Sequence, residues 1–264
     1  LNLTARIIQS PLIWEASFFY SYVKEKVTEY AVDPVPTNAA IYSSGLTGIG
    51  PSPVEGFPIY SIFSFPTATL DPDNGNPRGI LEGEPSSDYS RIMAETTIDE
   101  LNFHGSSIPT HFGALRNQLI WKGFDLSANI SYRMGYYFRR ESIVYDNLNR
   151  GEISHADYEQ RWQNPGDELI TDIPSDPGIS NPQRNLFDQV SSRSIRKGDH
   201  IRLQDIRMSY CFRPGKGPKS PEVQIYSYAN NLAVLWKAAK DVRDPDFRNF
   251  QAPRSFSIGL KINY

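Results

Sequence analysis

Hydrophobic and polar residues alternate strictly at the C-terminal end of the chain. Over residues 255–264 every second position is apolar, with Phe256, Ile258, Leu260, Ile262 and Tyr264 separated by small or polar residues. A period of two places all apolar side chains on one face of a β-strand and the polar ones on the other. The pattern therefore predicts a terminal strand with one apolar and one polar face.

Six further segments carry a version of this alternation, namely residues 1–7, 12–27, 115–121, 124–136, 201–212 and 223–236. In residues 201–212 the phase changes halfway, which predicts a β-bulge near Gln204 and Asp205. In residues 223–236 the phase stays open, because Tyr226 and Tyr228 compete with two aliphatic residues for the apolar face. Together these segments predict about seven strands.

The connections between the predicted strands alternate between short and long. The short ones are residues 9–11, 122–123 and 213–220, and the long ones are residues 28–110, 138–198 and 237–254. Outer-membrane barrels have short turns on the periplasmic side and long loops outside. If the C-terminus is periplasmic, seven strands place every short turn on that side. The predicted fold class is all-β: the C-terminal segment of a large transmembrane β-barrel, with about seven antiparallel strands and long extracellular loops.

Aromatic residues lie near both ends of the predicted strands. Those at the short-turn ends are Trp14, Trp121, Phe124, Phe212 and Tyr264, and those toward the long loops are Tyr20, Tyr22, Tyr132 and Tyr136. Two aromatic girdles flanking an aliphatic band are typical of a lipid-facing wall. A soluble β-sandwich, the alternative fold, would concentrate its aromatics in the middle of the apolar face.

The long connections predict little regular structure. Nine prolines between residues 34 and 85 disfavour a long helix or a central strand. We expect a local strand within residues 56–70 and a turn at residues 71–76, which resembles a calcium loop but departs from its residue order. Ser154 and the following residues resemble a capping box and predict a short helix through Trp162.

Composition narrows the classes of function. The chain has 264 residues, a net charge of −3 and one cysteine, Cys211. No run of about 18 apolar residues exists, which excludes a transmembrane helix, and the near-neutral charge disfavours nucleic acid as a partner. The chain begins in mid-alternation at Leu1, and seven strands are too few to close a large barrel, so we expect a piece of a longer protein.

Catalytic chemistry is not predicted. The four histidines, His104, His111, His155 and His200, have no metal-ligand spacing, and no hydrolase or phosphate-binding motif occurs. Asp167 and Glu168 have no second carboxylate placed for glycoside cleavage. We therefore expect no metal, no cofactor and no enzyme activity, which disfavours a secreted β-rich hydrolase.

Five stretches in order resemble the C-terminal third of SusC/RagA-type TonB-dependent transporters: residues 123–130, 161–168, 197–206, 228–236 and 252–260. The resemblance implies a barrel in the outer membrane of a Gram-negative bacterium, with residues 1–264 forming its C-terminal portion and an N-terminal plug lying outside this chain. It also implies energy from the TonB complex, a SusD-like surface lipoprotein as a lid, and import of oligosaccharides or peptides. The competing function is a soluble β-sandwich that binds carbohydrate.

Three sets of residues are the candidates for function. Aromatic and hydrogen-bonding groups in the loops suit contact with substrate or lid, although they can equally pack the loop against itself: Tyr137, Arg139, Arg140, Trp162, Asn164 and Asp167. Charged residues on the polar strand faces are expected to line a wet lumen: Arg6, Glu15, Arg116, Asp125, Arg133, Arg207 and Lys261. The last strand resembles the signal read by barrel-assembly machinery, at Phe256, Gly259, Leu260, Ile262 and Tyr264.

Overall fold

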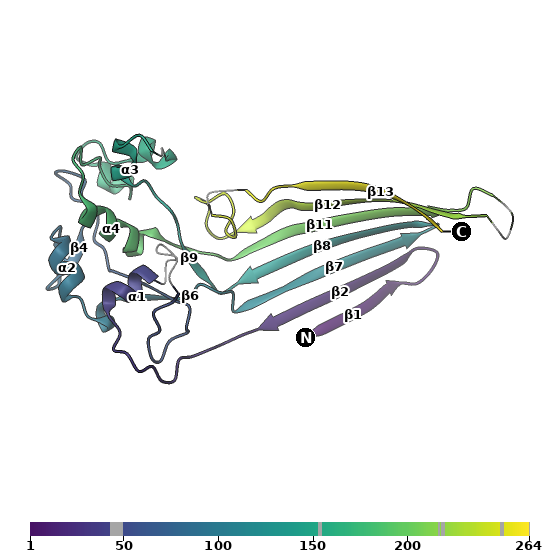
Figure 1. The fold of residues 1–264 in the computed structure, drawn as a ribbon, viewed down its shortest axis with the longest axis horizontal. Coiled ribbons are helices and arrows are strands. Elements are labelled where there is room, and N and C mark those ends of the chain that lie inside the picture. Colours follow the sequence, from purple (N-terminus) through teal and green to yellow (C-terminus); the bar gives the residue numbers. More distant parts are fainter. Residues whose placement is uncertain (43–49, 153–154, 216, 218–219, 249–250, 264) are drawn as a thin grey trace. The chain divides into compact units, whose positions relative to one another are not determined.

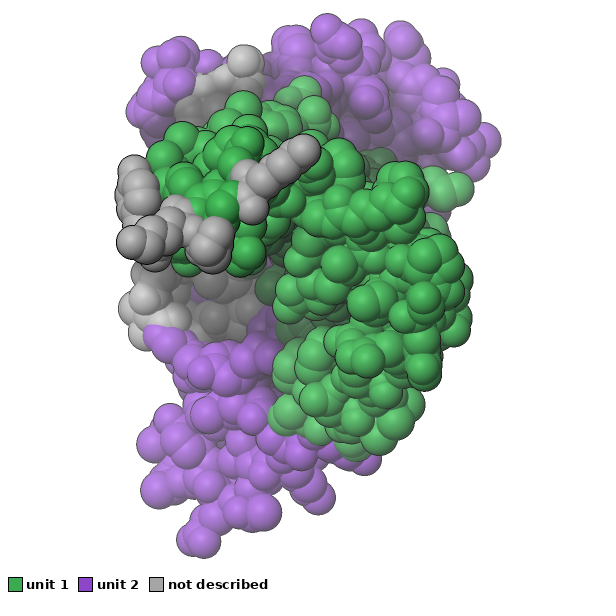
Figure 2. Space-filling model, turned by 90° about the vertical axis from the view of Figure 1, so that its right-hand side faces the viewer, with its two compact units in different colours: residues 1–23, 109–136, 198–264 green, residues 24–108, 137–197 purple. Residues whose placement is uncertain are grey.

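The computed structural model describes residues 1–264 apart from 43–49, 153–154, 216, 218–219, 249–250 and 264. The chain divides into two compact units. Unit 1 comprises Leu1–Val23, Pro109–Tyr136 and Gly198–Tyr264, and unit 2 comprises Lys24–Ile108 and Tyr137–Lys197 (Figure 2, green and purple). Within the described residues, no helix is long and apolar enough to cross a membrane.

Unit 1 is a seven-stranded antiparallel sheet (Figure 1). Its strands, in spatial order, are β1 (Asn2–Ile8), β2 (Ile13–Tyr22), β7 (His111–Trp121), β8 (Phe124–Met134), β11 (His200–Phe212), β12 (Glu222–Lys237) and β13 (Ser255–Asn263). The sheet is open, with β1 and β13 at its edges. The predicted all-β class with seven antiparallel strands is therefore confirmed.

The bulge predicted in β11 is present. The register of β11 with both neighbouring strands shifts between Leu203 and Asp205, and against β8 this shift leaves Gln204 as the extra residue. The shift brings Ile201 and Leu203 onto the same face as Ile206, since these residues pair with Tyr132, Ile130 and Ala128 of β8 in turn. One inserted residue thus keeps the apolar face continuous along a strand whose sequence changes phase.

The structure also settles the phase of β12. Tyr226 and Tyr228 pair with Ser209 and Arg207 of β11, so both tyrosines lie on the polar face of the sheet. On its other side Tyr226 pairs with Gly259 of β13. A Cβ atom at Gly259 would lie 2.2 Å from Cζ of Tyr226, so the tyrosine ring occupies the space that a side chain there would need.

The strand predicted over residues 124–136 ends at Met134. Gly135 has a φ of 74°, a left-handed conformation that breaks the extended backbone. Tyr136, which the sequence placed in an exposed aromatic girdle, is instead buried, and its hydroxyl lies 3.2 Å from Nδ1 of His200. The prediction that Tyr136 belongs to an aromatic girdle is wrong, because the extended backbone of β8 ends at Gly135 and the Tyr136 side chain is buried beyond it.

Unit 2 is built from short elements. They are α1 (Pro36–Tyr42), β3 (Ser61–Ser64), β4 (Gly79–Leu81), β5 (Glu84–Ser86), α2 (Tyr89–Glu95), β6 (Asn102–Ser106), β9 (Tyr137–Arg139), α3 (Tyr145–Asn149), α4 (Pro182–Val190) and β10 (Ile195–Lys197). Four 3₁₀ turns join them: Ile98–Glu100, Ala156–Gln160, Asp167–Leu169 and Ser192–Ser194. The regions predicted to be irregular therefore contain local helices and hairpins, and the strand expected over residues 56–70 is confined to β3.

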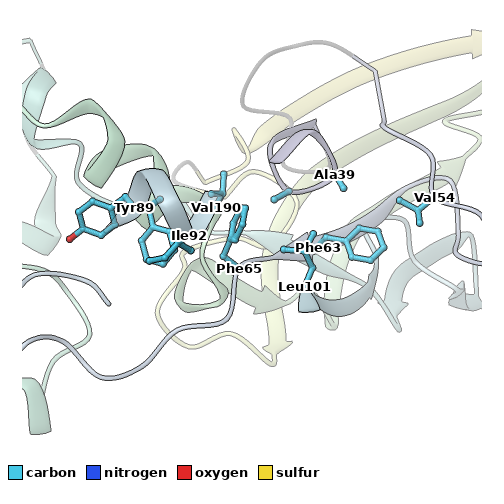
Figure 3. Packing of buried hydrophobic residues seen from close by; sticks show 10 residues of the cluster. Ala39, Val54, Phe63, Phe65, Tyr89, Ile92, Leu101 and Val190 are labelled. Carbon is cyan, nitrogen blue, oxygen red and sulfur yellow. The ribbon is translucent and has the colours of Figure 1, made fainter. Parts of the chain in front are cut away.

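Unit 2 has its own hydrophobic core. Figure 3 shows side chains from β3, α2 and α4 meeting there, and Phe65, Ile92, Phe187 and Val190 are fully buried. Phe65 and Phe187 lie 6.2 Å apart between ring centroids. Burial of a large apolar side chain contributes roughly 1.5–3 kcal/mol to the stability of the fold. This cluster therefore gives unit 2 a folded core, which the proline-rich sequence did not predict.

Two helical segments differ from the sequence prediction. Helix α4 was not predicted; it begins with Pro182 after Asn181, whose Oδ1 accepts a hydrogen bond from the Arg184 N–H at 3.0 Å. The helix expected through Trp162 is a shorter 3₁₀ turn, Ala156–Gln160, capped by His155. Ser154, the expected capping residue, lies outside the described residues.

Candidate functional site

One face of the seven-stranded sheet is apolar and exposed. In β13, Phe256 is 73% exposed and Ile258 is 84% exposed. The register places Ala229, Ser227 and Ile225 of β12 beside this row, and the apolar face continues through the neighbouring strands. A contiguous apolar surface of this kind marks contact with a membrane or another protein rather than with water.

Aromatic groups lie at both ends of this apolar face. At the short-turn end, the rings of Phe124 and Tyr210 are 4.3 Å apart, and Trp14 Nε1 donates a hydrogen bond to Asn117 Oδ1 at 3.2 Å. At the other end, the Tyr20 hydroxyl lies 2.8 Å from Nδ1 of His111. Trp14, Tyr20 and Tyr210 combine an apolar ring with a polar group, as residues at a membrane interface do.

The opposite face of the sheet is polar. By strand register it carries all seven charged residues that the sequence assigned to a lumen: Arg6, Glu15, Arg116, Asp125, Arg133, Arg207 and Lys261. Arg6 and Glu15 form an ion pair at 3.7 Å, and Asp125 accepts hydrogen bonds from Gln118 Nε2 at 2.9 and 3.0 Å. The two faces thus differ in kind, and the assignment of the polar face to a lumen stays a prediction.

A partly buried ion cluster ties Asp244 and Asp246, which follow β12, to the polar face. Arg202 Nη2 lies 2.5 Å from Asp244 Oδ1, and Asp246 contacts Arg133 at 2.7 Å and His200 at 3.3 Å. Burial alone would raise the pKa of Asp246, but hydrogen bonding to His200 and the positive charges of Arg133 and Arg202 hold that pKa below its usual range. Sequence reasoning missed this cluster because its members lie far apart along the chain.

Arg139, predicted to contact substrate or lid, lies inside unit 2 and is 4% exposed. Its guanidinium donates hydrogen bonds to five acceptors at 2.7–3.4 Å: Gln189 O, Ser191 O, Ser194 Oγ, Phe63 O and Ala40 O. Burial lowers the pKa of Arg139 to about 9. The acceptors offset the cost of burying this charge, so Arg139 joins β9, β3, α1 and the end of α4.

Arg140 points to a carboxylate within the same unit. It forms two hydrogen bonds with Asp157, one of them from Nη1 to Oδ2 at 2.7 Å, and Ser142 Oγ donates to the same Oδ2 at 2.8 Å. Burial by itself would raise the pKa of Asp157, but the hydrogen bonds from His155, Arg140 and Ser142 outweigh it and lower that pKa strongly. The pair fixes the position of the Ala156–Gln160 turn.

Trp162, Asn164 and Asp167 belong to one cross-braced turn. Trp162 is buried, and its Nε1 donates to Glu168 Oε2 at 3.2 Å. Asp167 Oδ2 accepts from the backbone N–H groups of Gln163 and Asn164, both at 2.9 Å. Such side-chain bonds to backbone fix a loop without regular secondary structure.

This turn, residues 162–171, presents two aliphatic side chains to solvent. Leu169 is 82% exposed and Ile170 is 84% exposed, directly after the acidic pair Asp167 and Glu168. Of the other loop candidates, Asn164 is exposed and Tyr137 is half-buried, with its ring 6.2 Å from that of His104. The six loop candidates therefore do not converge on one surface patch through exposed side chains.

Metal chemistry has no support in the described part of the chain. No group of three or more His, Cys, Asp or Glu side chains gathers there in a way that suits a metal ion. The predicted turn at residues 71–76 is present, and Asp71 Oδ1 accepts from the Asp73 N–H at 2.9 Å. The side chain that opens this turn thus bonds to its own backbone, as in a plain Asx turn.

Comparison with known proteins identifies the fold. No family model matches the sequence, and no curated protein matches it. Among solved structures, the RagAB peptide transporter has a chain with a TM-score of 0.69 at 18% identity, matched over 100% of this chain and 28% of that one. The RagAB peptide importer matches in its "closed-closed" state (TM-score 0.68, 16% identity, 100% and 29% covered) and in its "open-open" state (0.65, 16%, 100% and 28%).

These matches define a class by fold. The chain spans less than a third of the transporter chains that it resembles. At this level of identity the likeness shows the fold alone, which is that of a segment of a RagAB transporter chain. The structural neighbours are transporters and not enzymes.

Proposed function

We propose that this chain forms part of the wall and the outer loops of a SusC-like, TonB-dependent transporter that imports peptides or glycans across the outer membrane of a Gram-negative bacterium. The observation that carries this proposal is the exposed apolar face of the sheet, bordered by aromatic groups at both ends. The fold match over the whole chain to the RagAB transporter chains supports the same conclusion.

The physical basis is the need to cover this face. Each fully exposed Phe, Ile or Leu that moves from water into lipid gains roughly 1.5–3 kcal/mol. Inside a bilayer, however, every backbone N–H and C=O must also be paired. The edges β1 and β13 therefore require neighbouring strands, which the remainder of the barrel would supply.

The polar face is proposed to face the interior of that barrel. Its ion pairs and side-chain hydrogen bonds, such as that from Gln118 to Asp125, suit contact with water or with a plug domain. Energy would reach the transporter from the TonB complex through the part of the protein that precedes this segment. The predicted lumen residues would then meet substrate or plug.

Leu169 and Ile170 are proposed to contact a SusD-like lipoprotein that closes over the loops. Two large aliphatic side chains on a turn braced by four hydrogen bonds form a preorganised contact. The candidates Trp162 and Asp167 would act here by holding the turn, and Asn164 by direct contact. A Leu169→Ser/Ile170→Ser variant is expected to fold normally and to lose co-purification of the lipoprotein.

Fractionation of native cells followed by intact-mass determination tests the proposed location. We expect this sequence in the detergent-extracted outer membrane, on a species several times heavier than 29.9 kDa. Recovery in the soluble fraction at the mass of this chain would overturn the proposal and favour a soluble carbohydrate-binding module. The exposed apolar face argues against that alternative, since a soluble sandwich buries it.

A further inference from the structure

Unit 2 contains a pocket of about 280 Å³ beside the turn formed by residues 162–171. Its lining is polar and includes four hydroxyl groups, two carboxylates and one guanidinium; the residues are 67–70, Glu168, Thr171, Asp172, Ser192 and Arg193. The volume lies just below the roughly 300–1,000 Å³ of drug-sized sites, so the pocket suits a small polar group or the end of a chain.

A backbone segment in which one residue, Thr67, has no backbone partner among the described residues forms one wall of the pocket. Phe65 N–H donates to Val190 O at 3.1 Å, and Ser192 N–H donates to Phe65 O at 2.9 Å. Ala68 N–H points the other way, to Arg78 O at 3.0 Å. Because backbone groups alternate along an extended chain, the N–H and C=O of Thr67 face the side of Ser192.

The chain leaves Thr67 without a backbone partner on that side. After Ser191 it turns into the 3₁₀ segment Ser192–Ser194, so the pairing with Phe65 does not continue. Within the described part of the chain no group bonds the Thr67 N–H or C=O, although its hydroxyl lies 2.8 Å from Ser192 Oγ. A free N–H and C=O on extended backbone are what an added peptide strand pairs with.

The charges around the pocket favour a cation. Arg193 is already paired with Asp188, and Asp172 is more than half exposed, with its carboxylate 3.6 Å from Arg196. The lining residues and these partners together carry three carboxylates, those of Glu168, Asp172 and Asp188. They carry two guanidinium groups, those of Arg193 and Arg196, so one negative charge is left over. The described lining also contains no aromatic ring, the usual platform for a sugar.

We propose that this pocket binds the amino-terminal end of a short extended peptide, whose backbone pairs with Thr67 and whose ammonium group lies near Asp172 and Glu168. The proposal rests on the proposed import function and deepens it, because it selects peptides over glycans. Backbone pairing would accept many sequences, and the carboxylates would select the free amino terminus.

Two probes test the proposal on the purified full-length protein in detergent: trialanine and N-acetyl-trialanine, titrated by calorimetry. We expect trialanine to bind about two- to fivefold more tightly, the range that one exposed ion pair provides. Asp172→Asn should abolish that preference, and Glu84→Gln, which changes an exposed carboxylate outside the pocket, should leave it intact. Equal affinity for the two peptides in the unmodified protein, or no binding at millimolar concentration, would overturn the proposal.

A second pair of variants isolates the backbone. Thr67→Pro removes the N–H and should weaken the binding of both peptides alike. Thr67→Ala removes the hydroxyl and a methyl group but keeps the N–H, so it should bind both peptides as the unmodified protein does. If Thr67→Pro fails to fold, Asp172→Asn still decides the question. If the protein is found in the outer membrane but does not prefer trialanine, peptide binding in the pocket is refuted and the transport role stands. If the protein is soluble and prefers trialanine, the transport role is refuted and peptide binding stands.

Discussion

The buried guanidinium of Arg139 offers the sharpest test of how unit 2 is held together. Arg139→Met keeps much of the side-chain volume and removes donors to five acceptors, among them Phe63 O at 2.8 Å and Gln189 O at 2.7 Å. A buried acceptor left without a partner costs roughly 1–3 kcal/mol. Relaxation recovers part of this cost, as does removal of the buried charge, so we expect a net loss of about 3–5 kcal/mol.

Hydrogen exchange measured by mass spectrometry on the full-length protein can locate this loss. Exchange in β9 and in α4 should become about 100- to 4,000-fold faster, since 1.4 kcal/mol corresponds to a factor of ten. Peptides from β11 serve as an internal reference, because the variant does not touch the sheet of unit 1. The matched control is Arg150→Met, whose guanidinium is exposed and pairs with Glu152, and it should leave exchange in β9 and α4 unchanged.

Unchanged hydrogen exchange in the Arg139→Met variant would contradict this prediction. If Arg139→Met leaves exchange in β9 and α4 within a factor of five of the unmodified protein, the five hydrogen bonds do not stabilise the unit and the reasoning from burial is wrong. If that same stable variant loses peptide binding, Arg139 acts as a ligand contact, as the sequence had suggested, and must become accessible in the bound state.

Three further predictions concern the sheet and the loops. Gly259→Ala should destabilise the protein by about 1–3 kcal/mol in thermal unfolding, because the new Cβ would lie 2.2 Å from the Tyr226 ring, and Tyr226→Ala should restore most of that loss. The pKa of Asp157 is depressed in the folded state, so the ionised carboxylate stabilises the fold fully above the unfolded pKa of about 3.8, and this stabilisation is lost as the pH falls further. Denaturant titrations at pH 6 and pH 3 should show this loss. Asp157→Asn should be less stable than the unmodified protein at pH 6, and its stability should depend less on pH. Ile258→Arg on the apolar face should cost roughly 2–4 kcal/mol for folding into lipid vesicles, whereas Ser257→Arg on the polar face should cost less than about 1 kcal/mol; equal costs would contradict a lipid-facing wall.

The candidate loop residues show the limits of reading a loop from its sequence. Arg139 and Trp162 are residue types that binding surfaces often use. Both are buried, however, and both hold segments of unit 2 in place. The exposed aliphatic side chains Leu169 and Ile170, which we propose as contact groups, belong to no sequence motif. Burial depends on contacts between residues up to 99 positions apart, such as Arg139 with Ala40, and local sequence does not encode these.

The alternation of apolar and polar residues was sufficient to predict the sheet of unit 1. The alternation predicted seven strands, their two faces and the bulge at Gln204, because a strand with one apolar and one polar face must repeat every two residues, whatever its partners. The phase of β12 was not decided that way, since tyrosine suits either face; only pairing with Arg207, Ser209 and Gly259 placed its tyrosines on the polar side. Unit 2 depended on tertiary structure still more, because its core joins short, proline-punctuated segments from two distant parts of the chain, none long enough to show a period.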